Sequence, residues 1–227
     1  MIDRKRFFDN VRSRFGALSQ AQVDGYNAIL DVWEARGLTD LRWLAYILAT
    51  AWHETAFTMQ PVREYGRGNG RPYGVRDAAT GQTYYGRGYV QITWKANYEK
   101  LGRRLGLDLV SNPDRALDPT IAARILVIGM QEGMFTGRRL SDYFAGGAAA
   151  WVTARRIVNG LDKADAIAGY ARKYHDALTA AEVAVAPAPV RPDAPMPTAP
   201  APAAPVAATS LWGRFWAALK TRLLNVA

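Results

Sequence analysis

Two glutamates, Glu54 and Glu64, lie ten positions apart in the sequence, on either side of a proline. Inverting cleavage of a glycosidic bond needs a carboxylic acid that protonates the leaving oxygen and a carboxylate that activates water, about 6.5–9.5 Å apart. Glu54 ends an apolar run that contains Trp52, which favours a raised pKa and the role of acid. Glu64 lies among arginines and glycines, which favour an ionised base. The pair predicts a site that cleaves polysaccharide.

Pro61 is expected to bring the two carboxylates together. An unbroken helix would separate Glu54 from Glu64 by about 15 Å, at about 1.5 Å per residue. Proline disfavours helix at the residue before it, so Met59-Gln60-Pro61 should end the helix that carries Glu54. We therefore expect the chain to turn there and to place Glu64 across a cleft from Glu54.

A polar and aromatic block follows the second glutamate. Residues 84–93 read Tyr-Tyr-Gly-Arg-Gly-Tyr-Val-Gln-Ile-Thr, and Asn97-Tyr98 and Ile157-Val158-Asn159-Gly160 come later. Together with His53-Glu54-Thr55, these motifs resemble glycoside hydrolase family 19, the chitinase group with a lysozyme-like fold that includes many phage endolysins. The resemblance covers about residues 15–180.

The resemblance implies a role for each candidate residue. Glu54 would be the general acid and Glu64 the general base, and Thr93 would supply the hydroxyl that holds the attacking water. Gln91, Asn97 and Asn159 match positions that hydrogen-bond the sugars. The full set of candidate substrate contacts is His53, Tyr85, Arg87, Gln91, Asn97 and Asn159.

Departures from the family pattern bear on the substrate. The loop between the two glutamates is much shorter than in plant chitinases, and the chain has no cysteine for the disulfides of those enzymes. The basic residue that plant members carry after the Asn-Gly has no secure counterpart, since Ala166 falls near its position. These differences favour the bacterial and phage branch, whose substrate is peptidoglycan.

Simpler interpretations of the same residues remain open. His53 could suggest a metal site, but the zinc signature needs a second histidine where Phe57 stands, so we expect His53 to orient Glu54 or pack beside it. Tyr85 and its tyrosine neighbours could fill the lobe instead of contacting sugar. Arg87 could pair with Glu54 or Glu64, or be solvated. We expect no metal and no organic cofactor.

Hydrophobic periodicity predicts a mainly helical fold, and residues 62–92, which lack that periodicity, are expected to form a small β-hairpin or irregular β lobe. The resemblance implies that this fold is of the α+β lysozyme-like class, with two helical lobes. Ser19 and Gln22 form a capping box, Thr39 and Thr93 are candidate helix caps, and Asp118-Pro119 opens another helix. The expected helices cover about residues 19–36, 39–58, 93–101, 121–134, 148–158 and 164–181.

The C-terminal part has a different composition. We divide the chain into a catalytic domain at 1–182, a proline- and alanine-rich linker at 183–209 and a basic amphipathic helix at 210–227. This last segment is predicted to lie on an anionic membrane or on lipopolysaccharide. Docking on the catalytic domain and binding of a partner protein are the alternatives. The predicted membrane contacts are Trp212, Phe215, Trp216, Leu219 and Leu223.

Composition narrows the class of protein. The 227 residues carry a formal charge of +9, which implies attraction to polyanions. No apolar segment follows the basic N-terminus, so we expect no secretory signal, accumulation in a host cytoplasm and holin-dependent release to the wall. We expect a monomer that binds peptidoglycan glycan strands and, lacking a groove-reading motif, no nucleic acid.

The predicted function is hydrolysis of the β-1,4 bonds of the MurNAc/GlcNAc glycan by an endolysin. The rivals are a chitinase and a basic, non-enzymatic protein that binds cell wall or nucleic acid.

Overall fold

The computed structural model describes residues 1–182, and within them the chain is mainly helical. One two-stranded antiparallel sheet joins β1 to β2, with Val62 opposite Gly88 and Arg63 opposite Arg87. Short 3₁₀ helices cover Pro72–Gly74, Pro113–Leu117, Leu140–Asp142 and Thr153–Ile157. The main elements are α1 (Arg4–Phe15), α2 (Gln20–Ala35), α3 (Leu41–Glu54), β1 (Val62–Arg63), β2 (Arg87–Gly88), α4 (Lys95–Leu105), α5 (Pro119–Glu132) and α6 (Ala164–Ala181).

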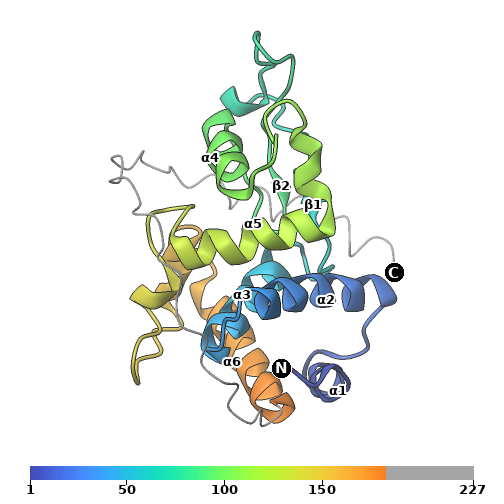
Figure 1. The fold of residues 1–227 in the computed structure, drawn as a ribbon, viewed down its shortest axis with the longest axis vertical. Coiled ribbons are helices and arrows are strands. Elements are labelled where there is room, and N and C mark those ends of the chain that lie inside the picture. The colour runs from blue at the N-terminus through green and yellow to red at the C-terminus, as the bar shows by residue number, and fades with distance from the viewer. Residues whose placement is uncertain (183–227) are drawn as a thin grey trace, which may run out of the picture.

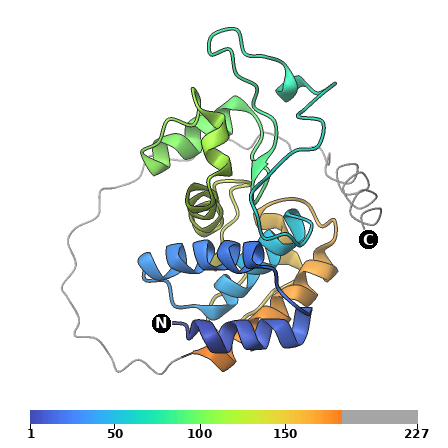
Figure 2. The same ribbon diagram turned by 90° about the vertical axis from the view of Figure 1, so that its right-hand side faces the viewer.

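The elements form two groups on either side of α5 (Figure 1). The sheet and α4 lie at one end of the molecule, and α1, α3 and α6 lie toward the other. α3 and α1 both pack against α6. α2 packs against α5. Figure 2 shows the loop between β1 and β2 projecting from the body of the fold. The predicted fold class is confirmed.

Within residues 1–182, no helix has both the length and the apolar character needed to cross a bilayer.

The central helix is α3. Every residue from Leu44 to Glu54 is buried, which confirms the prediction of a helix that is apolar nearly all round. Its cap is not the predicted Thr39 but Asp40, whose carboxylate accepts a hydrogen bond from the Arg42 amide. The helix starts one residue later than expected, so Asp40 is the residue placed to accept from the free amides of the first turn.

α2 forms as the sequence predicts. The side chain of Ser19 accepts from the Gln22 amide, and the Gln22 side chain accepts from the Ser19 amide, completing the capping box. Gly25 in this helix lies directly against the carbonyl of Met59, in the turn that follows α3. Because Gly25 has no side chain, the backbone of α2 can lie in direct contact with the backbone of this turn.

Replacing Gly25 by alanine is expected to destabilise the protein by about 1–3 kcal/mol, the usual cost of forcing extra atoms into a packed site. A Cβ at this position would lie 1.7 Å from the Met59 carbonyl oxygen, so the turn would have to move. Gly169→Ala in α6 is the matched control, because its Cβ would have no neighbour within 4 Å. Urea unfolding measures both, and equal stabilities would contradict the prediction.

The β lobe predicted at residues 62–92 is confirmed in its irregular form and not as a hairpin, because a long irregular loop separates its two short strands. Two other predicted elements differ from the structure. Thr93 does not cap a helix: α4 begins at Lys95 after Trp94, whose φ is 69° and whose side chain makes no cap. The helix expected at 148–158 is only the 3₁₀ turn Thr153–Ile157, since the glycines and alanines before it are exposed and give a longer helix no face to bury.

α1 was not expected from the sequence. Asp3 caps it by accepting from the Arg6 amide, and Phe7, Phe8 and Val11 are buried. These apolar side chains face the core, so α1 adds a further layer against α6. The linker and the amphipathic segment predicted at 183–227 lie outside the described residues.

Candidate active site

Glu54 is the last residue of α3 and is completely enclosed. Its side chain has 0% exposure, and Oε1 accepts a hydrogen bond of 2.6 Å from Nη1 of Arg155, which is itself 1% exposed. Arg155 lies in the 3₁₀ helix Thr153–Ile157, and its Nε also donates to the Asp162 carbonyl. Among residues 1–182, no hydrogen-bond partner reaches the buried Glu54 Oε2. One carboxyl oxygen is therefore fixed and the other is left available.

Burial raises the pKa of Glu54 above its ordinary value, and the positive charge and hydrogen bond of Arg155 oppose this rise. A carboxyl group with a raised pKa keeps its proton at higher pH, as a general acid requires. Burial, aided by the charges of Arg155 and Lys163, lowers the pKa of His53 to about 4. The His53 imidazole is therefore neutral at pH 7. Of these two neighbours of Glu54, only Arg155 carries a positive charge.

The chain reverses direction directly after Glu54. Thr55 is the C-cap, and Ala56, Phe57 and Met59 have φ values of 48°, 71° and 52°. The expectation that Pro61 ends the helix is therefore wrong, because the helix has ended and the chain has turned several residues earlier. Left-handed backbone costs free energy in non-glycine residues and persists only where neighbouring structure fixes it.

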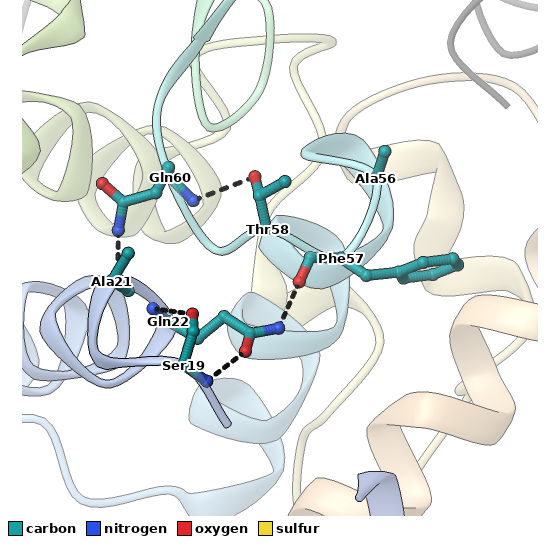
Figure 3. A pocket seen from close by; sticks show the side chains of 7 residues that line it. All are labelled: Ser19, Ala21, Gln22, Ala56, Phe57, Thr58 and Gln60. Atoms are coloured by element: carbon teal, nitrogen blue, oxygen red, sulfur yellow. Dashed lines mark hydrogen bonds between the residues drawn. The ribbon is translucent and has the colours of Figure 1, made fainter. Parts of the chain in front are cut away.

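The N-terminal end of α2 fixes this turn (Figure 3). Nε2 of Gln22 donates to the Phe57 carbonyl at 2.9 Å, and Nε2 of Gln60 donates to the Ala21 carbonyl. The Phe57 ring points away from these contacts in Figure 3 and packs 5.2 Å from the Trp52 ring. A shallow pocket of about 420 Å³ lies at this junction, and neither candidate glutamate lines it.

Glu64 follows β1 and is half-buried. Its Oε1 accepts from the Tyr73 hydroxyl at 2.7 Å, and its Oε2 accepts from the Gly86 amide at 2.9 Å. The Glu64 amide donates in turn to the Gly86 carbonyl at 2.7 Å. A Cβ at Gly86 would lie 2.8 Å from Oε1 of Gln91 and 3.2 Å from Cβ of Glu64, so a larger residue would require these side chains to shift. Accepting at both oxygens suits an ionised carboxylate, the form that a base needs.

Arg87 belongs to the framework of the β lobe. It is buried, its Nε donates to Asp114 at 2.7 Å, and its Nη1 donates to the Tyr98 hydroxyl at 3.0 Å. The guanidinium also stacks 3.6 Å from the ring centre of Tyr85. The possibility that Arg87 pairs with Glu54 or Glu64 is wrong, since Asp114 is the acid that it meets. Tyr85 and Arg87 hold β2 in place next to Glu64.

The predicted polar contacts are also engaged in local hydrogen bonds. Nε2 of Gln91 donates to the carbonyls of Val62 and Gly88, and joins the two strands. The Asn97 amide donates to the Thr93 carbonyl at 2.8 Å, and both residues are half-buried. Asn159 accepts from the Gly160 amide through Oδ1. The buried Oε1 of Gln91 has no hydrogen-bond partner within residues 1–182.

The candidate residues fall into two connected sets. One set surrounds Glu64 and includes β2 and Gln91. The other surrounds Glu54 and Arg155, and Asn159 joins it because its amide donates to the Arg155 carbonyl at 3.0 Å. That the two carboxylates face each other across one cleft stays a prediction. Within the described chain, no cluster of three or more histidine, aspartate and glutamate side chains could hold a metal ion.

Two residues of the site were not predicted. Arg155 precedes the Ile157-Val158-Asn159-Gly160 motif by two positions, and Tyr73 lies in the 3₁₀ helix Pro72–Gly74 between β1 and β2. An arginine pair just ahead of a functional motif was the only signal for Arg155. Nothing in the sequence marked Tyr73 as a donor to Glu64.

Comparison with known proteins places the sequence match in the β lobe and the helices after it. Residues 61–130 match the model of glycoside hydrolase family 19, described as chitinase class I. Endochitinase A2 of Pisum sativum is 53% identical over 45 residues, which are 19% of this chain and 14% of that protein. An endochitinase of Persea americana is 35% identical over 117 residues, 45% of this chain and 35% of that protein. The chain thus matches well under two thirds of either relative.

Structural comparison extends the likeness beyond that segment. Chitinase C from Streptomyces griseus HUT6037 superimposes with a TM-score of 0.56 and 22% sequence identity, over 78% of this chain and 92% of that one. At this identity the superposition shows a shared fold. The match of residues 61–130 supports the family resemblance noted in the sequence, and the superposition supports the fold.

Proposed function

We propose that this chain, which its family model and its fold relate to glycoside hydrolase family 19, hydrolyses the β-1,4 bonds of a glycan by inverting acid/base catalysis. One observation carries the proposal: Glu54 is a buried carboxyl group with a raised pKa and one free oxygen, at the end of the central helix. An acid of this kind is what protonation of a glycosidic oxygen requires. Glu64, held as an acceptor at both oxygens, supplies the second carboxylate.

In this mechanism each residue has a defined task. Glu54 donates its proton to the leaving oxygen, and the Arg155 guanidinium then stabilises the carboxylate that remains. Glu64 removes a proton from the attacking water, which the Thr93 hydroxyl helps to hold. Because Glu54 is fully enclosed, the glycosidic oxygen reaches Oε2 only after the covering residues move. Substrate binding therefore has to open the site around Glu54.

Peptidoglycan is the proposed substrate, and host-cell lysis by an endolysin is the proposed role. The short connection between the two glutamates and the lack of cysteine support this choice over chitin. Under the same proposal the chain collects in the host cytoplasm, passes the inner membrane with a holin-like partner and acts as a monomer on the wall. Chitin remains the second candidate, because the matched relatives are named as endochitinases.

Mass spectrometry of digested peptidoglycan tests the proposal. Soluble fragments that carry a new reducing sugar are expected, and the identity of that sugar, MurNAc or GlcNAc, reports which bond is cut. Chitin oligosaccharides are digested in parallel. Release of chitin fragments alone would favour the chitinase, and release of neither product would contradict hydrolysis.

We further propose that residues 211–227, which lie outside the described structure, attach the enzyme to an anionic membrane. Their sequence places Trp212, Phe215, Trp216, Leu219 and Leu223 on one helical face, with basic residues and no acid in the segment. A chain truncated after residue 210 is expected to digest purified peptidoglycan as the full chain does, but to lose most of its co-sedimentation with anionic liposomes. Unchanged co-sedimentation would contradict the membrane role.

A further inference from the structure

The β lobe contains a polar pocket that the proposed chemistry does not use. Its volume is about 450 Å³, and it lies between the loop after Glu64, the loop before β2 and the 3₁₀ helix Pro113–Leu117. Arginines dominate the lobe: residues 61–92 contain five arginines, one glutamate and one aspartate. The residues that line the pocket include Arg67, Arg76, Gly81, Arg87 and Asp114.

The charges that line the pocket do not cancel. Asp114 is shared by Arg87 at 2.7 Å and by Arg63 at 2.7 Å, so its negative charge is already matched within the lobe. Arg67 and Arg76 are exposed, and within residues 1–182 neither forms an ion pair. Nε of Arg76 donates to the Gly81 carbonyl at 2.6 Å, which fixes the guanidinium at the wall of the pocket. The pocket therefore presents two unmatched guanidinium groups.

The backbone also fixes Arg67. Its φ is 50°, a left-handed conformation that costs free energy in a non-glycine residue. Glycines with positive φ flank it on both sides, and its amide donates to the Glu64 carbonyl at 3.0 Å. The same short turn thus carries the candidate base and a guanidinium that has no acidic partner. Strained backbone of this kind is typical of a binding site.

We propose that this pocket binds a carboxylate of the peptide stem carried by MurNAc, so that the lobe recognises an acidic glycan instead of a neutral one. The inference rests on the proposed function and names its substrate class. Guanidinium groups bind carboxylates through paired, charge-assisted hydrogen bonds. Chitin, a polymer of GlcNAc, has no carboxylate to offer. The turn shared with Glu64 would place the stem beside the sugars at the cleavage site.

Binding to insoluble peptidoglycan tests this proposal. Full-length protein is mixed with intact sacculi and with sacculi whose carboxylates have been amidated, and the bound fraction is measured by short co-sedimentation at low salt. The protein is expected to bind intact sacculi more tightly. Arg67→Ala/Arg76→Ala should weaken binding to intact sacculi by about tenfold, the effect of losing charge-assisted contacts at a partly exposed site. It should leave binding to amidated sacculi at the level of the unmodified chain.

The matched control is Arg138→Ala/Arg172→Ala, which removes the same charge from exposed positions outside the lobe. An equal loss of binding to intact sacculi in both double variants would overturn the proposed role of the pocket, since net charge alone would then explain binding. Equal binding to intact and amidated sacculi would overturn carboxylate recognition. Carboxylate-dependent binding without release of glycan fragments would support this inference and contradict hydrolysis, so the two proposals fail separately.

Discussion

Replacing Arg155 by methionine is expected to lower the free energy of unfolding at pH 7 by about 3–5 kcal/mol, the cost of breaking a buried ion pair on one side. The change leaves the Glu54 carboxyl group enclosed without a counter-charge. Urea unfolding, followed by circular dichroism, measures the loss. Methionine keeps much of the arginine volume, so an empty cavity contributes little.

A pH series identifies the carboxyl group as the cause. Because burial raises the pKa of Glu54 in the folded chain, the stability that comes from its protonated form is complete below the unfolded pKa and is lost as pH rises through the folded one. Without Arg155 the folded pKa rises further, so the stability of the variant should fall increasingly below that of the wild type as pH rises through the wild-type folded pKa, which lies above the ordinary value of 4.5. A deficit that does not change with pH would contradict this explanation.

The double variant Glu54→Gln/Arg155→Met provides the control. It removes both charges, and pairs of this kind can be replaced by neutral side chains at little cost. We expect it to be more stable at pH 7 than Arg155→Met alone. Equal stability would show that packing around residue 155, and not the unpaired carboxylate, decides the effect.

Glu54→Gln is expected to reduce the rate of glycan hydrolysis by about 10²–10⁴-fold, the usual contribution of general acid catalysis. The amide has nearly the shape of the carboxyl group but cannot transfer a proton to the leaving oxygen. Release of reducing ends from the purified substrate measures the effect. Wild-type activity in the variant would refute the role of Glu54.

Two controls separate lost chemistry from lost structure. Glu99→Gln in α4 makes the same substitution at a half-buried glutamate outside the site, and full activity is expected. An aryl glycoside with an acidic leaving group needs little protonation, so Glu54→Gln should lose far less rate on it than on the glycan. A variant that is equally slow on both substrates has lost its fold or its substrate contacts, which would contradict the assignment.

Local signals in the sequence predicted much of the helical framework. The capping box of α2, the Asp118-Pro119 start of α5 and the apolar periodicity of α6 each act within a few residues, and all three helices form as expected. α1 was missed although Asp3 caps it and Phe7 and Val11 are spaced four apart, because its many arginines gave it a polar composition. The β lobe was predicted at residues 62–92, but the sequence left open whether it is a hairpin or irregular, because its strands are only two residues long.

The candidate site shows a similar limit. The motif residues were easily picked out, but their partners lie far away in the sequence or in irregular loops. Arg155 is 101 positions from Glu54, and Tyr73 reaches Glu64 from an exposed loop. The end of α3 was placed too late, because the strained turn at Ala56 and Phe57 depends on contacts from α2 that proline rules cannot anticipate. Tertiary contacts, and not local propensity, set both features.

The long separation between Glu54 and Arg155 has a consequence during synthesis of the chain. Contacts between distant positions close a large loop, and such contacts form late in folding. A nascent chain that has emerged only as far as α5 contains both glutamates and the β lobe but lacks the cation that holds its acid. Cleavage in the exposed stretch at residues 145–150 would likewise separate the two halves of the pair without touching the motifs. The Glu54–Arg155 contact can form only after the 3₁₀ helix Thr153–Ile157 has packed against the end of α3, so the proposed activity would report that this late contact is in place.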